Sequence, residues 1–153
     1  MHKVAVICFL HYNYNYDNDN ESGESVNLIE QYLDLVIRIV TEKDFAEKIE
    51  FSEFRREYNN KVSKMIAIAA EIENEQPELK EDFCKLLFYE DKSIRIWVAH
   101  HILELMNCKL RYRKLALREI RKVARTDISA NGFGEKIWLK DWYKHHRTDR
   151  WLR

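Results

Sequence analysis

Glycine and proline are scarce in this chain, with three glycines and one proline among 153 residues. The tight turns of β-hairpins depend on such residues, so this scarcity disfavours a mainly β fold. Disorder is also disfavoured, because hydrophobic residues make up 46% of the chain and aromatic residues 12%. The length suits one sizeable core and is short for two domains. These features predict one ordered domain that is not mainly β, and the helical spacing from residue 25 onward makes the prediction all-α.

Cysteine is also limited, and it never occurs as a CxxC pair. Cys8, Cys84 and Cys108 are odd in number and far apart, which favours buried free thiols in a reducing compartment. The longest apolar run, Val4 to Leu10, is too short to cross a bilayer. A Tyr/Asn/Asp tract follows it in place of a signal-peptide cleavage site, so we expect a cytoplasmic protein that is not exported.

Motifs for catalysis or metal binding are missing from the sequence. It contains no GxSxG motif, no glycine-rich phosphate loop and no HExxH. Gly132-Phe-Gly134 follows a predicted helix rather than a strand, so it predicts a loop rather than a nucleotide site. We expect no enzyme activity, no cofactor and no metal.

Histidines offer one alternative to that expectation. His100 and His101 lie close to Glu104, and the pair at 145–146 would complete a metal site if the fold brought it near. However, His101 falls within an apolar stripe, which is more typical of a hydrogen-bonded core histidine than of a ligand.

Apolar residues recur at helical spacing from about residue 25 onward. We predict a single helical domain over 25–153, preceded by an extension at 1–24 that is irregular or contains a short strand. Ser25 is a predicted N-cap, and 44–47 resembles a capping box. The predicted helices span 28–40, 52–75, 77–89, 91–106 and 110–125, and after a loop at 126–134 a last helix places Ile137, Trp138 and Trp142 on one face.

The segment 91–106 is the most informative of these helices. Its main apolar stripe is complemented by Ile96 and Leu103 on the opposite face. A surface helix needs only one apolar stripe, whereas an inner helix in a stack of helical pairs is covered on both sides. The pattern therefore predicts a short, HEAT-like α-solenoid of about six helices. The main stripe consists of Ile94, Trp97, Val98, His101, Ile102 and Leu105.

The net charge of zero conceals two oppositely charged halves. Residues 107–153 hold 14 basic and 5 acidic side chains, a net charge of +9, which leaves −9 for residues 1–106. Such polarity is typical of a chain with a charged partner, although the two halves can instead face each other within the fold.

An acidic stretch is the first candidate for partner binding. Its carboxylates suit a basic partner because they resemble a phosphate backbone, although they also suit helix capping and solubility. The candidate residues are Glu71, Glu73, Glu75, Glu78, Glu81, Asp82, Glu90 and Asp91.

The basic helix at 109–125 is the second candidate, with a nucleic-acid backbone as its partner. The alternatives are a solvated outer helix and one neutralised by acidic neighbours. Its cations, opposed only by Glu119, are Lys109, Arg111, Arg113, Lys114, Arg118, Arg121, Lys122 and Arg125, and the aromatics expected nearby are Tyr112, Trp138, Trp142 and Tyr143.

Two segments also resemble a known family. Ile94-Arg-Ile-Trp-Val-Ala-His-His-Ile-Leu-Glu104 and the later Gly134-Glu-Lys-Ile-Trp-Leu-Lys-Asp-Trp142 are similar to the small HEAT-like proteins encoded beside bacterial polymorphic toxins. Leu139 and Trp142 match the Leu-x-x-Trp ending of that family's closing helix. The resemblance covers roughly 25–146, and its motifs are mainly structural.

That resemblance implies an immunity protein of a contact-dependent growth inhibition system. Such a protein binds a cognate toxin domain as a heterodimer and blocks it, and no catalytic residues come with the resemblance. The acidic stretch favours a nuclease as the toxin, because nucleases bind their substrates through basic surfaces. The alternative function is nucleic-acid binding through the basic helix, and a general scaffold is a third.

Overall fold

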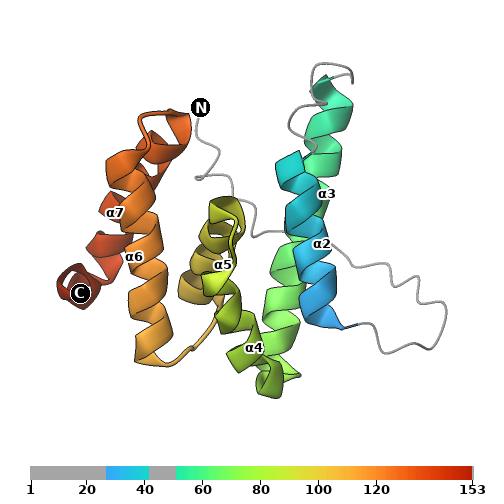
Figure 1. The fold of residues 1–153 in the computed structure, drawn as a ribbon, viewed down its shortest axis with the longest axis horizontal. Coiled ribbons are helices and arrows are strands. Elements are labelled where there is room, and N and C mark those ends of the chain that lie inside the picture. The colour runs from blue at the N-terminus through green and yellow to red at the C-terminus, as the bar shows by residue number, and fades with distance from the viewer. Residues whose placement is uncertain (1–26, 42–50, 153) are drawn as a thin grey trace.

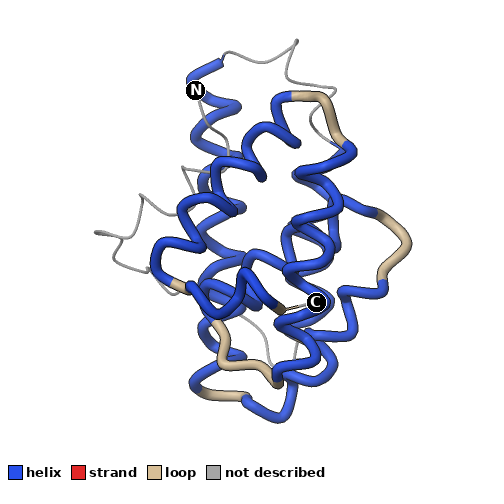
Figure 2. The backbone as a smooth tube through the Cα atoms, turned by 90° about the vertical axis from the view of Figure 1, so that its left-hand side faces the viewer, coloured by secondary structure: helices blue, strands red, loops and turns tan. Residues whose placement is uncertain are grey.

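A computed structural model describes residues 27–41 and 51–152, and all regular structure in these ranges is helical (Figures 1 and 2). Single 3-10 turns separate or follow some of the α-helices. The elements are α2 (Leu28–Thr41), α3 (Phe51–Asn74), η2 (Pro77–Leu79), α4 (Lys80–Lys85), η3 (Leu86–Phe88), α5 (Lys92–Leu105), α6 (Leu110–Thr126), α7 (Ala130–His145) and η4 (Arg147–Trp151).

The helices form a row of neighbouring layers. Helices α2 and α3 lie side by side at one end of the row, α6 and α7 at the other, and α5 lies between them above the short α4 (Figure 1). Helix α5 contacts α2 and α3 on one side and α6 on the other. The prediction of an all-α solenoid with six packed helices is confirmed for the described residues.

Helix α5 is buried on two sides, as its sequence predicts. Asp91 caps its N-terminus, because its carboxylate accepts hydrogen bonds from the backbone N–H groups of Ser93 and Ile94. Ile94 and Ile102 are buried in the main stripe, and Leu103 is buried on the opposite face. Complete burial of a branched aliphatic side chain such as Ile102 contributes about 1.5–3 kcal/mol to stability. Trp97 and Leu105 are half-buried.

The single helix predicted at 77–89 is instead divided into η2, α4 and η3. Pro77 begins η2, which agrees with the predicted position of the proline. The peptide N–H of Leu79 bonds to the carbonyl of Gln76, and that of Tyr89 bonds to Leu86, both with the shorter 3-10 spacing. The tighter winding accompanies burial of Phe83, Cys84, Leu86 and Leu87.

The predicted loop at 126–134 is wrong over its second half. Helix α7 begins at Ala130, where Ser129 caps it through a hydrogen bond from the N–H of Asn131. Gly132 lies inside the first turn, so Gly132-Phe-Gly134 is not a loop. A Cβ atom on Gly132 would lie 1.8 Å from the backbone oxygen of Asp127. Close packing of the helix against the preceding turn therefore overrides the low helix propensity of glycine.

The last helix differs from its predicted face at one position. Trp138 and Trp142 are buried and stack with their ring centroids 4.9 Å apart, whereas Ile137 is exposed. Glu135 takes part in the buried face instead. Residues 135, 138 and 142 share one face of the helix. A helix turns about 100° per residue, so the side chain of residue 137 points away from that face.

Some predictions lie outside the described residues. These are the N-terminal extension at 1–24, the Ser25 cap and the capping box at 44–47. At the start of α2 itself, Asn27 accepts a hydrogen bond from the N–H of Ile29. Among the helices that the structure describes, none combines the length and apolar character that crossing a membrane requires.

Candidate functional site

The eight acidic candidates do not form one patch. Glu71 to Asp82 lie around the turn from α3 into α4, which we call the α3–α4 corner (residues 71–82). This corner contacts the connection between α5 and α6, because Glu73 accepts a hydrogen bond from the N–H of Asn107. Glu90 and Asp91 lie at the opposite end of α5 (Figure 1). A 14-residue helix is about 20 Å long, so the two groups are separated by roughly that distance.

Two of the acids at the corner are committed to internal contacts. The Glu73 carboxylate lies 2.8 Å from Lys80 Nζ. Glu81 pairs with Lys109 at 3.0 Å and with Arg111, and it accepts a hydrogen bond from the Tyr112 hydroxyl. The hydrogen bonds from Tyr112 and Lys109 lower the pKa of Glu81 to about 2. Here the acidic and basic halves of the chain face each other.

The remaining acids differ in how strongly they are engaged. Glu71 accepts a hydrogen bond from the side chain of Gln76, and Asp82 pairs with Lys85 at 2.6 Å. Asp91 is the cap of α5. Of the eight candidates, three are exposed and have no ion pair or side-chain hydrogen bond within the described part of the chain: Glu75, Glu78 and Glu90.

Four of the eight cations of the basic helix are likewise used inside the fold. Arg113 pairs with buried Asp149 at 3.0 Å, and Arg121 donates to the Tyr143 hydroxyl and to the Asp149 carbonyl. Lys109 and Arg111 are held by Glu81 as described above. Three exposed cations of this helix, spaced one turn apart, have side chains with neither an ion pair nor a hydrogen bond within the described ranges: Lys114, Arg118 and Lys122.

The surroundings of this helix differ from those predicted. Glu119 does not oppose the basic side chains, because it pairs with Arg95 of α5 at 3.0 Å. Tyr112, Trp138 and Trp142 are buried, so their rings are not available to stack on bases. Tyr143 is half-buried under Arg121 and Arg150. The basic helix therefore offers a line of charge without exposed aromatic rings from these positions.

A buried network around His100 was missed by sequence reasoning. The His100 Nε2 atom lies 3.0 Å from Glu135, and its Nδ1 atom lies 3.3 Å from Glu104. The Trp138 indole N–H donates to Glu104 at 2.6 Å, and the ring of Trp138 meets that of His100 edge-on. The network joins α5 to α7. The four-residue spacing of His100 and Glu104 was available in the sequence, but Glu135 was assigned to the segment just after a loop.

The close contacts within this network keep His100 and Glu104 in their charged forms. Burial alone would lower the pKa of His100, but hydrogen bonds and charge interactions with Glu104 and Glu135 outweigh it and raise the pKa to about 9. Burial would raise the pKa of Glu104, yet its contacts with His100 lower it overall. His100 is therefore an imidazolium at neutral pH. Both of its ring nitrogens are occupied by carboxylates, which leaves no free position for acid–base catalysis on a substrate.

His101 points to a different side of α5, toward α2. Its Nδ1 atom lies 2.7 Å from the hydroxyl of buried Tyr32 in α2, so the predicted hydrogen-bonded core histidine is confirmed. The Nε2 atom is buried without a hydrogen-bond partner among the described residues. Burial lowers the pKa of His101 to about 4, so the ring is neutral at neutral pH.

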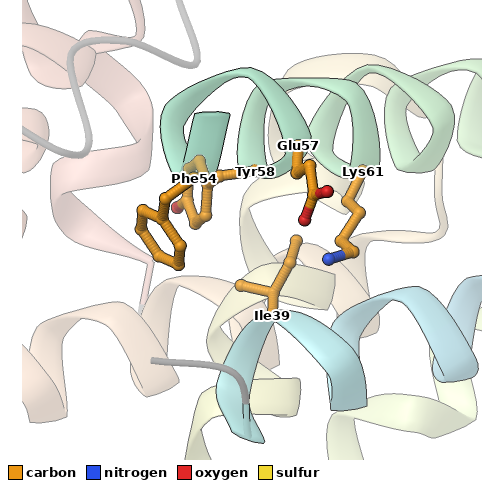
Figure 3. Close-up of a pocket in the computed structure, with 5 residues that line it drawn as sticks. All are labelled: Ile39, Phe54, Glu57, Tyr58 and Lys61. Atoms are coloured by element: carbon orange, nitrogen blue, oxygen red, sulfur yellow. The ribbon is translucent and has the colours of Figure 1, made fainter. Parts of the chain in front are cut away.

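A small hollow lies between α2 and α3 (Figure 3). Ile39 forms one side, and Phe54, Glu57, Tyr58 and Lys61 line the other. The rings of Phe54 and Tyr58 are 6.3 Å apart, and burial raises the pKa of Tyr58. Its phenol is therefore neutral at neutral pH. The hollow lies away from both charged candidate surfaces.

Metal binding finds no support in the described residues, where no three His, Cys, Asp or Glu side chains are grouped to hold an ion. His146 stacks on Trp142 instead of approaching His100 or His101. No family model, characterised protein or solved structure matches the chain.

Proposed function

We propose that this protein is an immunity protein that binds a cognate toxin domain and blocks its active site. The observation that supports this most directly is the pair of unneutralised carboxylates Glu75 and Glu78 at the α3–α4 corner. Glu75 follows the end of α3 and Glu78 lies in η2, and the nearby Asp82 of α4 has only an exposed ion pair with Lys85. A basic surface that normally binds a phosphate backbone is complementary to such a group. A nuclease is thus the favoured toxin.

The mode of action in this proposal is binding without catalysis, in a heterodimer formed in the cytoplasm. Of the eight acidic candidates, Glu75, Glu78 and Asp82 would make the main contacts. Glu73 and Glu81 would act indirectly. The hydrogen bond from Asn107 to Glu73 and the ion pair of Glu81 with Lys109 hold the corner against the connection that leads into α6. Glu90 lies at the far end of α5 and would contribute only if the toxin covers that whole helix.

A titration calorimetry experiment tests this proposal. The partner is the C-terminal toxin domain encoded by the neighbouring gene, and the variant is Glu75→Lys/Glu78→Lys. We expect affinity to fall by about tenfold or more at low salt, because two attractive charges become repulsive. The matched control is Glu30→Lys/Glu53→Lys, which makes the same change in net charge at exposed positions of α2 and α3 and should bind nearly as well as the original protein.

Circular dichroism establishes that each variant is folded. If the folded Glu75→Lys/Glu78→Lys variant binds with unchanged affinity, the α3–α4 corner is not the interface. If the toxin domain is not bound by the original protein at all, the immunity proposal itself is wrong.

A second candidate function is nucleic-acid binding through α6. It is favoured by the line of exposed cations Lys114, Arg118 and Lys122, whose charges are not neutralised within the described residues. Fluorescence anisotropy with duplex RNA and DNA at several salt concentrations tests it. Replacing all three by Gln should reduce the slope of log K against log salt by about 3, since each phosphate contact contributes about 0.9.

The control for this measurement replaces three exposed lysines elsewhere, Lys64, Lys136 and Lys140, by Gln. Equal losses in both variants would indicate general electrostatic attraction rather than a site on α6. Absence of binding at low salt would eliminate this function.

A further inference from the structure

Two cysteines from different parts of the fold meet in the core. Cys84 lies in α4 and Cys108 in the connection between α5 and α6, with their Sγ atoms 3.1 Å apart. Both thiols are free and buried. The contact is not imposed by sequence proximity, because the whole of α5 lies between the two residues. Packing of α4 against the connection between α5 and α6 brings the sulfurs together.

The two thiols are not equivalent. The Cys84 S–H donates a hydrogen bond to the Cys108 sulfur. This bond lowers the pKa of Cys108, whereas it raises the pKa of Cys84 together with burial. Cys108 is 8% exposed and Cys84 only 1%. Cys108 is thus the sulfur that a small oxidant reaches and the one that ionises more readily.

We propose that Cys84 and Cys108 form a reversible disulfide when the protein meets a hydroperoxide. The Cys108 thiolate attacks the terminal peroxide oxygen, which breaks the O–O bond, releases an alkoxide or hydroxide and leaves a sulfenic acid. The Cys84 sulfur then attacks the Cys108 sulfur, and the sulfenic oxygen leaves as water after taking the Cys84 proton. Two electrons pass from the thiols to the peroxide, and a small thiol reverses the step by exchange.

The disulfide would link α4 to the start of α6 by a covalent bond. Glu81 already joins these elements through Lys109 and Arg111, one turn of α4 away from Cys84. The loop closed by the new bond would contain all of α5, the central helix of the row. Closing a loop of about 25 residues restricts the unfolded chain and so raises thermal stability.

Hydrogen peroxide is the probe for this proposal, applied to the full chain with Cys8→Ser so that Cys8 does not compete. After native treatment and alkylation, mass spectrometry should show loss of two hydrogen atoms and a peptide containing linked Cys84 and Cys108. The melting temperature should rise by about 10 °C. Dithiothreitol should restore both the thiols and the original melting temperature.

The matched variants are Cys8→Ser/Cys84→Ser and Cys8→Ser/Cys108→Ser, which should show no linked peptide and no peroxide-dependent rise in melting temperature. The peptide map of the Cys8→Ser protein decides the question even if these variants fold poorly. Two free thiols after peroxide treatment, irreversible oxidation of Cys108, or a bond between two molecules would each overturn the proposal.

Discussion

His100 and His101 are neighbours on one helix, yet at neutral pH the ring of His100 is positively charged and the ring of His101 is neutral. His100 faces α7, where Glu104 and Glu135 hold it as an imidazolium with a pKa of about 9. His101 faces α2, where it contacts Tyr32, and burial holds its ring neutral with a pKa of about 4. Both side chains are buried. Burial disfavours the charged form of both rings, and only at His100 do neighbouring carboxylates outweigh it.

The difference between the two histidines results directly from helix geometry. Successive residues of an α-helix differ in direction by about 100°, so adjacent side chains reach different neighbouring helices. One face of α5 is thereby joined to the C-terminal part of the row by charge, and another is joined to α2 by a neutral hydrogen bond. The predictions below test this difference, beginning with the largest expected effect.

Removing the charged histidine should have the largest effect. His100→Ala leaves the Glu135 and Glu104 carboxylates close together without their cation, and we expect a loss of about 3–5 kcal/mol in the free energy of unfolding. Urea denaturation measures it. The double variant His100→Met/Glu135→Leu, which also removes one buried charge, should lose less than His100→Ala alone. A loss below about 1 kcal/mol for His100→Ala would contradict the charged network.

The pH dependence of stability should reveal both histidines in one experiment. The raised pKa of His100 stabilises the fold fully below about pH 6.5, and this contribution is lost as pH rises toward 9. The lowered pKa of His101 stabilises the fold above about pH 6.5, and this contribution is lost as pH falls toward 4. Each limb should amount to about 3 kcal/mol, with maximum stability near pH 6.5. Denaturant titrations at several pH values measure the profile, and a flat profile from pH 6.5 to 9 would contradict the assignment for His100.

Removing the neutral partner should cost less. Tyr32→Phe keeps the aromatic contact with Phe83 but leaves both ring nitrogens of buried His101 without a partner, so we expect a loss of about 1–3 kcal/mol. Thermal and urea denaturation measure the change. Tyr58→Phe is the matched control, because the Tyr58 hydroxyl has no hydrogen bond among the described residues and its removal should change stability little. Equal losses in the two variants would argue against a stabilising Tyr32–His101 bond.

Removing an exposed ion pair should have the smallest effect on stability. Asp34 and Arg38 lie one turn apart on α2 at 2.8 Å, and both side chains are largely exposed. Solvent screens such a pair, so Asp34→Asn should leave the melting temperature unchanged within experimental error. A shift comparable to that of Tyr32→Phe would show that surface charge matters more in this protein than the comparison suggests.

Much of the fold follows from the sequence because its helices have strong periodicity. The two-sided apolar pattern of 91–106 predicts an inner helix, and α5 is one. Errors occur where tertiary contacts override local preference. Glycine disfavours helix, yet Gly132 is helical because the chain passes close to Asp127. Helical spacing alone also does not reveal that 77–89 winds partly as 3-10 turns.

The candidate site was harder to predict for a different reason. Sequence composition identifies charged segments but not their partners. Glu81 and Glu75 were therefore equal candidates for binding a partner. Only the packing of α4 against α6 shows that Glu81 is bound by Lys109 and Arg111 whereas Glu75 remains exposed. Similarly, Glu135 pairs with His100 across 35 positions of sequence, a separation that no local pattern encodes.

The His100 network depends on Gly132, the residue of α7 that has a hydrogen atom in place of a side chain. Because a methyl group at this position would overlap the backbone oxygen of Asp127, α7 can begin where it does only with glycine there. Glu135 follows one turn later and reaches His100 from that starting point. Any larger side chain would push the helix away and withdraw the carboxylate. The proton that His100 keeps at neutral pH thus depends on the missing side chain of a residue in α7, three positions before Glu135.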